Sequence, residues 1–159
     1  MRKNLVAYFS VSGNTAYVAK NLAEITQADL YEIKPKNPYS SSDVNWNNPN
    51  SRSSIEMKDK FSRPEIEKLK IDMKGYQTIY LGFPIWWYTA PTIINTFLET
   101  YDFSHKKIVL FATSGGSGFG NTVENLKDSV DESTLILEGK VLNSQYSIDD
   151  LKTWVNHTK

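Results

Sequence analysis

Cysteine is absent from this chain of 159 residues, and histidine occurs only twice. Without a thiol the protein can form no disulfide, cysteine-ligated zinc site, iron–sulfur cluster or thiolate nucleophile. His105 and His157 lie far apart in the sequence, which disfavours a metal site built from histidine. The pattern G-x-S-x-G is also missing, so little supports a hydrolase. We assign no side chain as a catalytic acid, base or nucleophile, and none as a metal ligand.

An excess of charge of one sign is missing as well, because 18 basic residues balance 18 acidic ones. Proteins that bind nucleic acid usually carry a basic excess, so we expect no nucleic acid partner. No apolar run approaches the ~20 residues of a membrane span, and the first residues show no signal-peptide pattern. The length corresponds to one domain covering residues 1–159. We therefore expect a soluble, cytoplasmic, single-domain protein without a membrane partner, whose oligomeric state the sequence leaves open.

Three short runs are almost continuously apolar, which is typical of parallel strands covered on both faces of a sheet. They are residues 5–9, 78–83 and 107–112. Residues 29–33 alternate between polar and apolar, which indicates an edge strand, and residues 135–137 form a fifth, weaker candidate.

The segments between these strands carry apolar residues at the spacing of an α-helix. The expected helices lie around Val18, Leu22 and Ile25; from Pro91 to Tyr101; around Val123, Leu126 and Val130; and after Ser147, which is suited to be an N-cap. Alternating strands and helices favour right-handed crossovers around a parallel sheet. We therefore predict an α/β three-layer sandwich with five parallel strands in the order 2-1-3-4-5.

The segment at about residues 35–76 is much longer than one crossover requires. Its first half is rich in Asn, Ser and Pro, and its second half predicts short helices near residues 55–61 and 64–69. Tyr39 and Trp46 favour a covering loop with a function over a disordered excursion, because disordered segments rarely carry large aromatics. On this hypothesis Arg52 meets an anionic group of a substrate or a nicotinamide cofactor. The alternative is that Arg52 forms a surface ion pair.

Ligands of such sheets bind beyond the carboxyl ends of the strands, so the turns after the first, third and fourth strands are the candidate site. The first turn offers three hydroxyls, a glycine and the N-terminus of a helix, which together suit a phosphate monoester. Its residues are Ser10, Val11, Ser12, Gly13, Asn14 and Thr15. The alternative is an ordinary helix start capped by hydroxyl residues.

The turn after the third strand contains three consecutive large aromatics, in the sequence Pro84, Ile85, Trp86, Trp87 and Tyr88. Three such side chains cannot all enter one core, and on a surface they would leave an apolar patch. A flat aromatic ligand lying against them would account for both facts. Packing under a helix, or a dimer surface, is the alternative.

The turn after the fourth strand is rich in glycine and begins with Thr113, Ser114, Gly115 and Gly116. Few side chains obstruct a ligand there, so backbone N–H groups can approach it closely. The stretch nearly matches the nucleotide-binding pattern G-x-x-x-x-G-K-S/T, but Asn121 replaces the lysine, which argues against an NTPase. A loose turn without a ligand is the alternative.

Residues 10–15 resemble the phosphate loop of flavodoxins, S/T-x-S/T-G-N/Q-T, and the two later turns occur in the matching order. The resemblance implies a flavodoxin-like protein that binds FMN. It implies that Ser10, Ser12, Asn14 and Thr15 hold the phosphate and that the loops at 84–88 and 113–116 flank the flavin ring. Electron-carrier flavodoxins are typically acidic, whereas this chain is neutral and carries the long segment at 35–76.

We therefore expect the protein to be an FMN-binding flavoprotein that works in redox chemistry as a flavodoxin-like oxidoreductase. It would pass reducing equivalents from NAD(P)H or a reductase to a quinone-type or similar small acceptor. The alternative is a one-electron carrier that docks on redox partner proteins. A binding or regulatory module without the cofactor is disfavoured by the intact loop at residues 10–15.

Overall fold

The computed structural model describes residues 3–68, 71–114, 117–143 and 146–158. Its strands are β1 (Lys3–Tyr8), β2 (Asp29–Glu32), β3 (Tyr76–Pro84), β4 (Lys107–Thr113) and β5 (Leu135–Val141). Its helices are α1 (Asn14–Thr26), α2 (Arg52–Lys58), α3 (Thr92–Thr100), α4 (Thr122–Lys127) and α5 (Ile148–His157), with a short 3-10 turn at Met73–Gly75. All strand pairs are parallel, and the sheet order is β2-β1-β3-β4-β5. The predicted fold class and strand order are confirmed.

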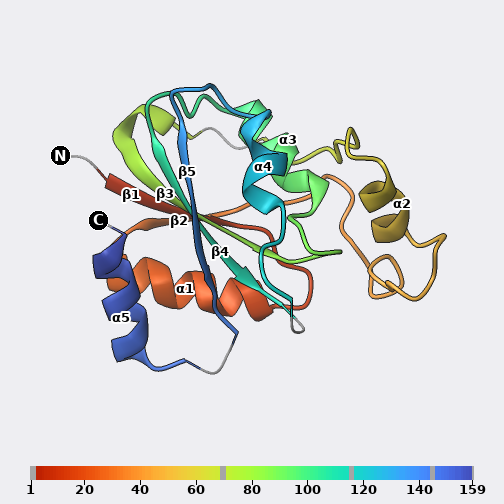
Figure 1. Cartoon of the computed structure of the whole chain (residues 1–159), viewed down its shortest axis with the longest axis horizontal. Coiled ribbons are helices and arrows are strands. Elements are labelled where there is room, and N and C mark those ends of the chain that lie inside the picture. The colour runs from red at the N-terminus through yellow and green to blue at the C-terminus, as the bar shows by residue number, and fades with distance from the viewer. Residues whose placement is uncertain (1–2, 69–70, 115–116, 144–145, 159) are drawn as a thin grey trace.

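Helices cover both faces of the sheet, as Figure 1 shows, with α1 and α5 on one face and α3 and α4 on the other. Two apolar clusters correspond to these faces. One includes Ile94 and Phe97 of α3, and the other includes Leu22 of α1 and Leu151 of α5. Burial from both sides explains why the central strands read as continuous apolar runs.

Several helix boundaries differ slightly from the sequence-based expectation. Pro91 is the N-cap of α3 rather than part of its first turn, and α4 ends at Lys127, before Val130. Ser147 caps α5 as predicted, since its Oγ accepts a hydrogen bond from the backbone N of Asp150 at 3.0 Å.

The predicted helix at 64–69 is wrong, whereas the one near 55–61 exists as α2, shifted toward the N-terminus because Ser51 caps it. Ile66 instead forms an antiparallel bridge with Pro35, and the backbones of residues 34–36 and 65–67 exchange hydrogen bonds. These bonds satisfy backbone groups that a helix would have used internally. Position 69 lies outside the described residues.

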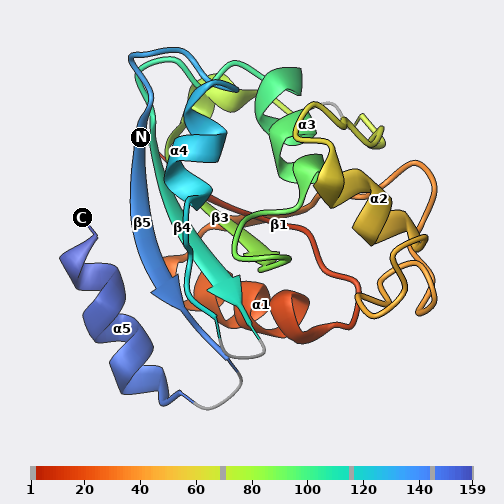
Figure 2. The same cartoon turned by 45° about the vertical axis from the view of Figure 1, so that its right-hand side comes forward.

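Figure 1 and Figure 2 show α2 and its preceding loop projecting from the body of the sheet. We call residues 37–51 the strap. None of the helices in the part of the chain that the structure describes is long and apolar enough to cross a membrane.

Candidate functional site

A pocket of about 680 Å³ opens at the carboxyl ends of β1, β3 and β4. Its volume falls in the range of small-molecule and cofactor sites, roughly 300–1,000 Å³. The described lining residues come from the three predicted turns, the strap and the start of α2: Val11, Ser12, Thr15, Val44, Trp46, Ser53, Pro84, Ile85, Trp86, Trp87, Tyr88, Ser114 and Ser117. The structure therefore brings the three turns together around one cavity.

The polar edge of this pocket is the turn after β1, residues 12–15. Gly13 stands at the N-cap of α1 with a φ of 95°, a conformation that glycine adopts without steric cost. No side chain caps this helix, so first-turn N–H groups beside Ser12 stay available to a ligand. Ser10 does not line the pocket; its Oγ accepts a hydrogen bond from the N–H of Gly13 at 3.2 Å and so holds the turn.

Thr15 and Thr113 connect the first and third turns. Their hydroxyls form a buried hydrogen bond of 2.8 Å, and only Thr15 reaches the pocket. Thr113 therefore fixes Thr15 against the end of β4 instead of facing the cavity. Gly115 and Gly116 lie outside the described residues.

The glycine-rich turn contributes two serines. Ser114 lines the pocket as expected, and its Oγ accepts a hydrogen bond from the N–H of Ser117 at 2.8 Å. Ser117 also lines the pocket and was not predicted from the sequence. Its position three residues after Ser114, within the same turn, was the sequence feature that could have predicted its place at the pocket.

The aromatic edge, residues 86–88, is a tight hairpin turn. The backbone N–H of Trp86 donates to the carbonyl of Thr89 at 3.0 Å, and the N–H of Thr89 donates back at 3.1 Å. Trp87 and Tyr88, the two central residues, have φ values of 49° and 64°. Positive φ at both positions is the type I′ pattern, which usually takes Asn-Gly. Large side chains in this conformation store strain, and such strain concentrates at functional sites.

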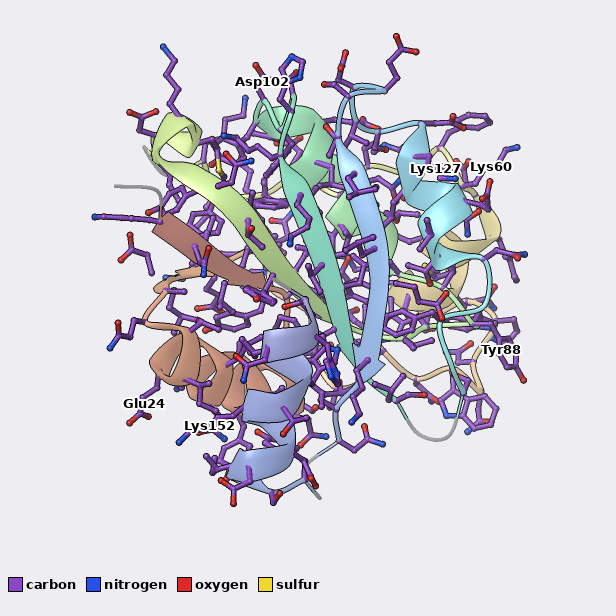
Figure 3. All side chains as sticks on the ribbon, turned by 60° about the vertical axis from the view of Figure 1, so that its left-hand side comes forward. Glu24, Lys60, Tyr88, Asp102, Lys127 and Lys152 are labelled. Carbon is purple, nitrogen blue, oxygen red and sulfur yellow. The ribbon has the colours of Figure 1, made fainter. Side chains whose placement is uncertain are left out.

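Of the three aromatic side chains of this edge, that of Trp86 points into the protein and those of Trp87 and Tyr88 are exposed. The ring of Trp86 lies 5.7 Å from that of Phe9 and 5.6 Å from that of Tyr39, in edge-to-face contacts. Trp87 is 44% exposed and Tyr88 69% exposed. Tyr88 points away from the body of the protein in Figure 3. The aromatic turn is therefore anchored by its first residue and presents the next two at the pocket.

The strap is fastened beside the pocket by Tyr39, Arg52 and Glu56. The Tyr39 hydroxyl donates a hydrogen bond to Glu56, and the Arg52 guanidinium lies 3.7 Å from the centre of the Tyr39 ring. Arg52 also pairs with Glu56 at 3.0 Å and donates to the Asn37 carbonyl at 2.6 Å. Burial, helped by the Glu56 carboxylate, raises the pKa of Tyr39 above its ordinary value. Arg52 is thus engaged internally, and the hypothesis that it meets a substrate anion is not supported.

Trp46 lies at the pocket, as the covering-loop interpretation requires, and is 71% exposed. Val44 and Ser53 line the same pocket and were not predicted from the sequence. Their sequence neighbourhood is polar and unpatterned, so only the folded strap reveals them.

Charged side chains do not occur among the described residues that line the pocket. Its polar side-chain groups are hydroxyls and indole N–H groups, and its aromatic residues are Trp46, Trp86, Trp87 and Tyr88. No group of residues suited to hold a metal ion is found within the described ranges. The arrangement fits a ligand with a flat apolar part and one anionic end directed to the start of α1.

A parallel sheet in the order 2-1-3-4-5, with a turn rich in hydroxyl residues after β1 and an aromatic turn after β3, is the arrangement of a flavodoxin-like protein. The family model described as Flavodoxin matches residues 3–158, and the chain belongs to this family.

Solved structures agree with this assignment. A candidate flavoprotein from Bacteroides eggerthii is 43% identical with a TM-score of 0.91, and the match covers 99% of this chain and 98% of that one. A candidate flavoprotein from Bacteroides uniformis is 42% identical with a TM-score of 0.90, covering 98% of each chain. A Lactobacillus acidophilus flavoprotein in complex with FMN is 23% identical with a TM-score of 0.69, covering 98% of this chain and 99% of that one, and it supports the fold. No curated protein matches the chain.

Proposed function

We propose that this protein binds FMN in the pocket at the ends of β1, β3 and β4. We further propose that it works as an oxidoreductase between a nicotinamide cofactor or reductase and a small acceptor. The observation that carries the proposal is the uncapped start of α1 facing an uncharged, aromatic pocket of about 680 Å³. Membership of the flavodoxin family supports the same ligand.

The residues present fit FMN at both of its ends. Ser12, Thr15 and the first-turn N–H groups of α1 would hold the phosphate, because a helix N-terminus carries a partial positive charge. Trp86, Trp87 and Tyr88 would flank the flavin ring. When bound, FMN supplies the electron-transfer chemistry, while the protein binds it, orients it and limits its contact with water.

An enzyme is favoured over a one-electron carrier by charge. A carrier that is steered to a partner benefits from a surface of one sign, whereas this chain has a formal net charge of zero. The strap adds a wall that ends in the exposed Trp46. Such a wall can shape a site for a small acceptor.

The phosphate site is tested by comparing FMN with riboflavin, which lacks the phosphate. Ser12→Ala should weaken FMN binding about ten-fold or more and riboflavin binding much less, because each hydrogen bond to a charged group contributes about 1.5–3 kcal/mol. Binding is followed by flavin fluorescence. Ser117→Ala, which alters the glycine-rich side of the same pocket, should affect both ligands alike. Equal losses for both ligands in Ser12→Ala would refute the phosphate assignment.

The redox role is tested separately by stepwise anaerobic photoreduction of the FMN-loaded protein. An enzyme that moves electrons in pairs should pass to the fully reduced flavin with little of the one-electron-reduced form. Accumulation of that form would support the carrier instead. A protein that is colourless once unbound FMN has been removed would contradict both roles.

A further inference from the structure

A second hollow, of about 230 Å³, adjoins the proposed flavin pocket. Trp46 and Trp87 line both cavities, so these two indoles form a shared wall. We call the smaller cavity the outer hollow; besides the indoles, α2 contributes Ser54, Met57 and Lys58. It lies where the strap, α2 and the aromatic turn meet.

The outer hollow offers flat, polarizable surfaces to a ligand. Trp46 is 71% exposed and Trp87 44% exposed, although large aromatics usually bury most of their surface. Met57 adds a thioether, which makes favourable contacts with aromatic rings. The cavity is smaller than a typical cofactor site, so it suits a ligand with one ring or two fused rings, the rest of which extends into solvent.

Lys58 is the charged residue among the described linings of the two cavities. Its Nζ donates to the Pro49 carbonyl at 3.2 Å, and no described carboxylate lies within ion-pair distance of it. Arg52 and Arg63, by contrast, are each paired with a glutamate. A cation held by a neutral carbonyl keeps its full charge and can still attract an anion.

We propose that the outer hollow binds a planar aromatic compound that carries an anionic group. The ring lies against Trp46 and Trp87, and the anion meets Lys58. This inference rests on the proposed function and deepens it: because the indoles are shared, the compound lies beside the flavin, and a quinone-type ring that carries the anionic group is the acceptor class that the protein selects.

A redox-inert probe, naphthalene sulfonate, measures the site without turnover. Its binding to the FMN-loaded protein is determined by equilibrium dialysis, with naphthalene methanol as the uncharged counterpart. Lys58→Gln keeps a donor for the Pro49 carbonyl but removes the charge, and it should weaken the sulfonate about five-fold, as expected for a solvent-accessible ion pair. The uncharged probe should bind as before.

Three further variants sharpen the comparison. Lys60→Gln removes a nearby charge that does not line the hollow and should leave both probes unchanged. Lys58→Arg should restore sulfonate binding, since it keeps the charge. Trp46→Ala should weaken both probes, because both depend on the shared wall.

The inference is overturned if Lys58→Gln binds the sulfonate as tightly as the parent, or if it loses both probes equally, which would indicate a disturbed loop. FMN affinity is measured in the same samples. Failure of FMN to bind refutes the proposed function, whereas normal FMN binding with an unchanged sulfonate affinity refutes only the outer hollow.

Discussion

The two edges of the pocket achieve their shapes in different ways. The polar edge at residues 12–15 uses a conformation that its own sequence favours, because Gly13 takes the positive φ. The aromatic edge at residues 86–88 places Trp87 and Tyr88 in positive φ against their local preference. The polar edge is thus encoded locally, whereas the aromatic edge must be held by the rest of the fold.

Neighbouring loops supply that support. Gly120 has a φ of 54°, and a Cβ built there would lie 2.3 Å from the carbonyl oxygen of Tyr88. The backbone after β4 therefore packs directly against the aromatic turn. Asn125 of α4 adds a hydrogen bond of 2.8 Å from its Nδ2 to the Thr89 hydroxyl. These contacts hold residues 86–88 in a turn conformation that their own sequence does not favour.

The largest expected effect comes from breaking this support with Gly120→Ala. The added methyl group meets the Tyr88 carbonyl and also strains a positive φ, so we expect a loss of about 2–4 kcal/mol in unfolding free energy. FMN binding should weaken as well, because Tyr88 moves. Urea unfolding and flavin titration measure both.

Gly118→Ala is the matched control, since a Cβ there meets nothing within 4 Å. It should leave stability and FMN affinity nearly unchanged. A Gly120→Ala protein as stable as Gly118→Ala would show that the aromatic edge does not depend on this contact.

The sheet and the start of the helix after β1 were predictable from the sequence because their signals are local. Apolar strand runs, the helix start after Gly13 and the cap at Ser147 are local signals, and the structure places all of them as expected. The aromatic turn was located, but its division into inward Trp86 and outward Trp87 depends on distant Phe9 and could not be deduced.

The segment at 35–76 was predictable only in outline. Ile66 was expected in the predicted helix at 64–69, but its backbone instead pairs with that of Pro35. That Thr113 lies behind Thr15 rather than at the pocket wall was not predictable, because their hydrogen bond joins residues far apart in sequence. Tertiary hydrogen bonds of this kind leave no local pattern.

A smaller effect is expected from Tyr39→Phe, which loosens the strap beneath the aromatic edge. The variant loses the hydrogen bond to Glu56 but keeps the ring that packs on Trp86. We expect a loss of about 1 kcal/mol in unfolding free energy near neutral pH.

The same variant changes the alkaline limb of the stability profile. Folding raises the pKa of Tyr39, so the unfolded chain loses this proton first as pH rises past 10.0, the ordinary value. The stability from the protonated phenol is complete below that pH and declines above it.

Tyr39→Phe should therefore lose less stability than the parent between pH 10 and 11, by about 1 kcal/mol. Tyr76, whose pKa is raised to about 12 by burial and Asp29, contributes equally to both proteins. Parallel urea midpoints over this range would contradict a buried role for the Tyr39 hydroxyl.

The smallest effect on stability is expected from Trp46→Phe, which tests whether the strap belongs to the aromatic edge. Trp46 is 71% exposed, so its replacement should change the unfolding free energy by less than about 0.5 kcal/mol. Because Trp46 lines the proposed flavin pocket, FMN should quench its fluorescence together with that of Trp86 and Trp87. Trp46→Phe should therefore reduce the FMN-dependent drop in tryptophan emission while leaving the protein folded. Trp154 packs on Tyr80 at the α5 face of the sheet, so Trp154→Phe should remove emission that FMN does not quench. An equal FMN-dependent drop in Trp46→Phe and the parent would separate the strap from the flavin site and leave the aromatic edge to residues 86–88 alone.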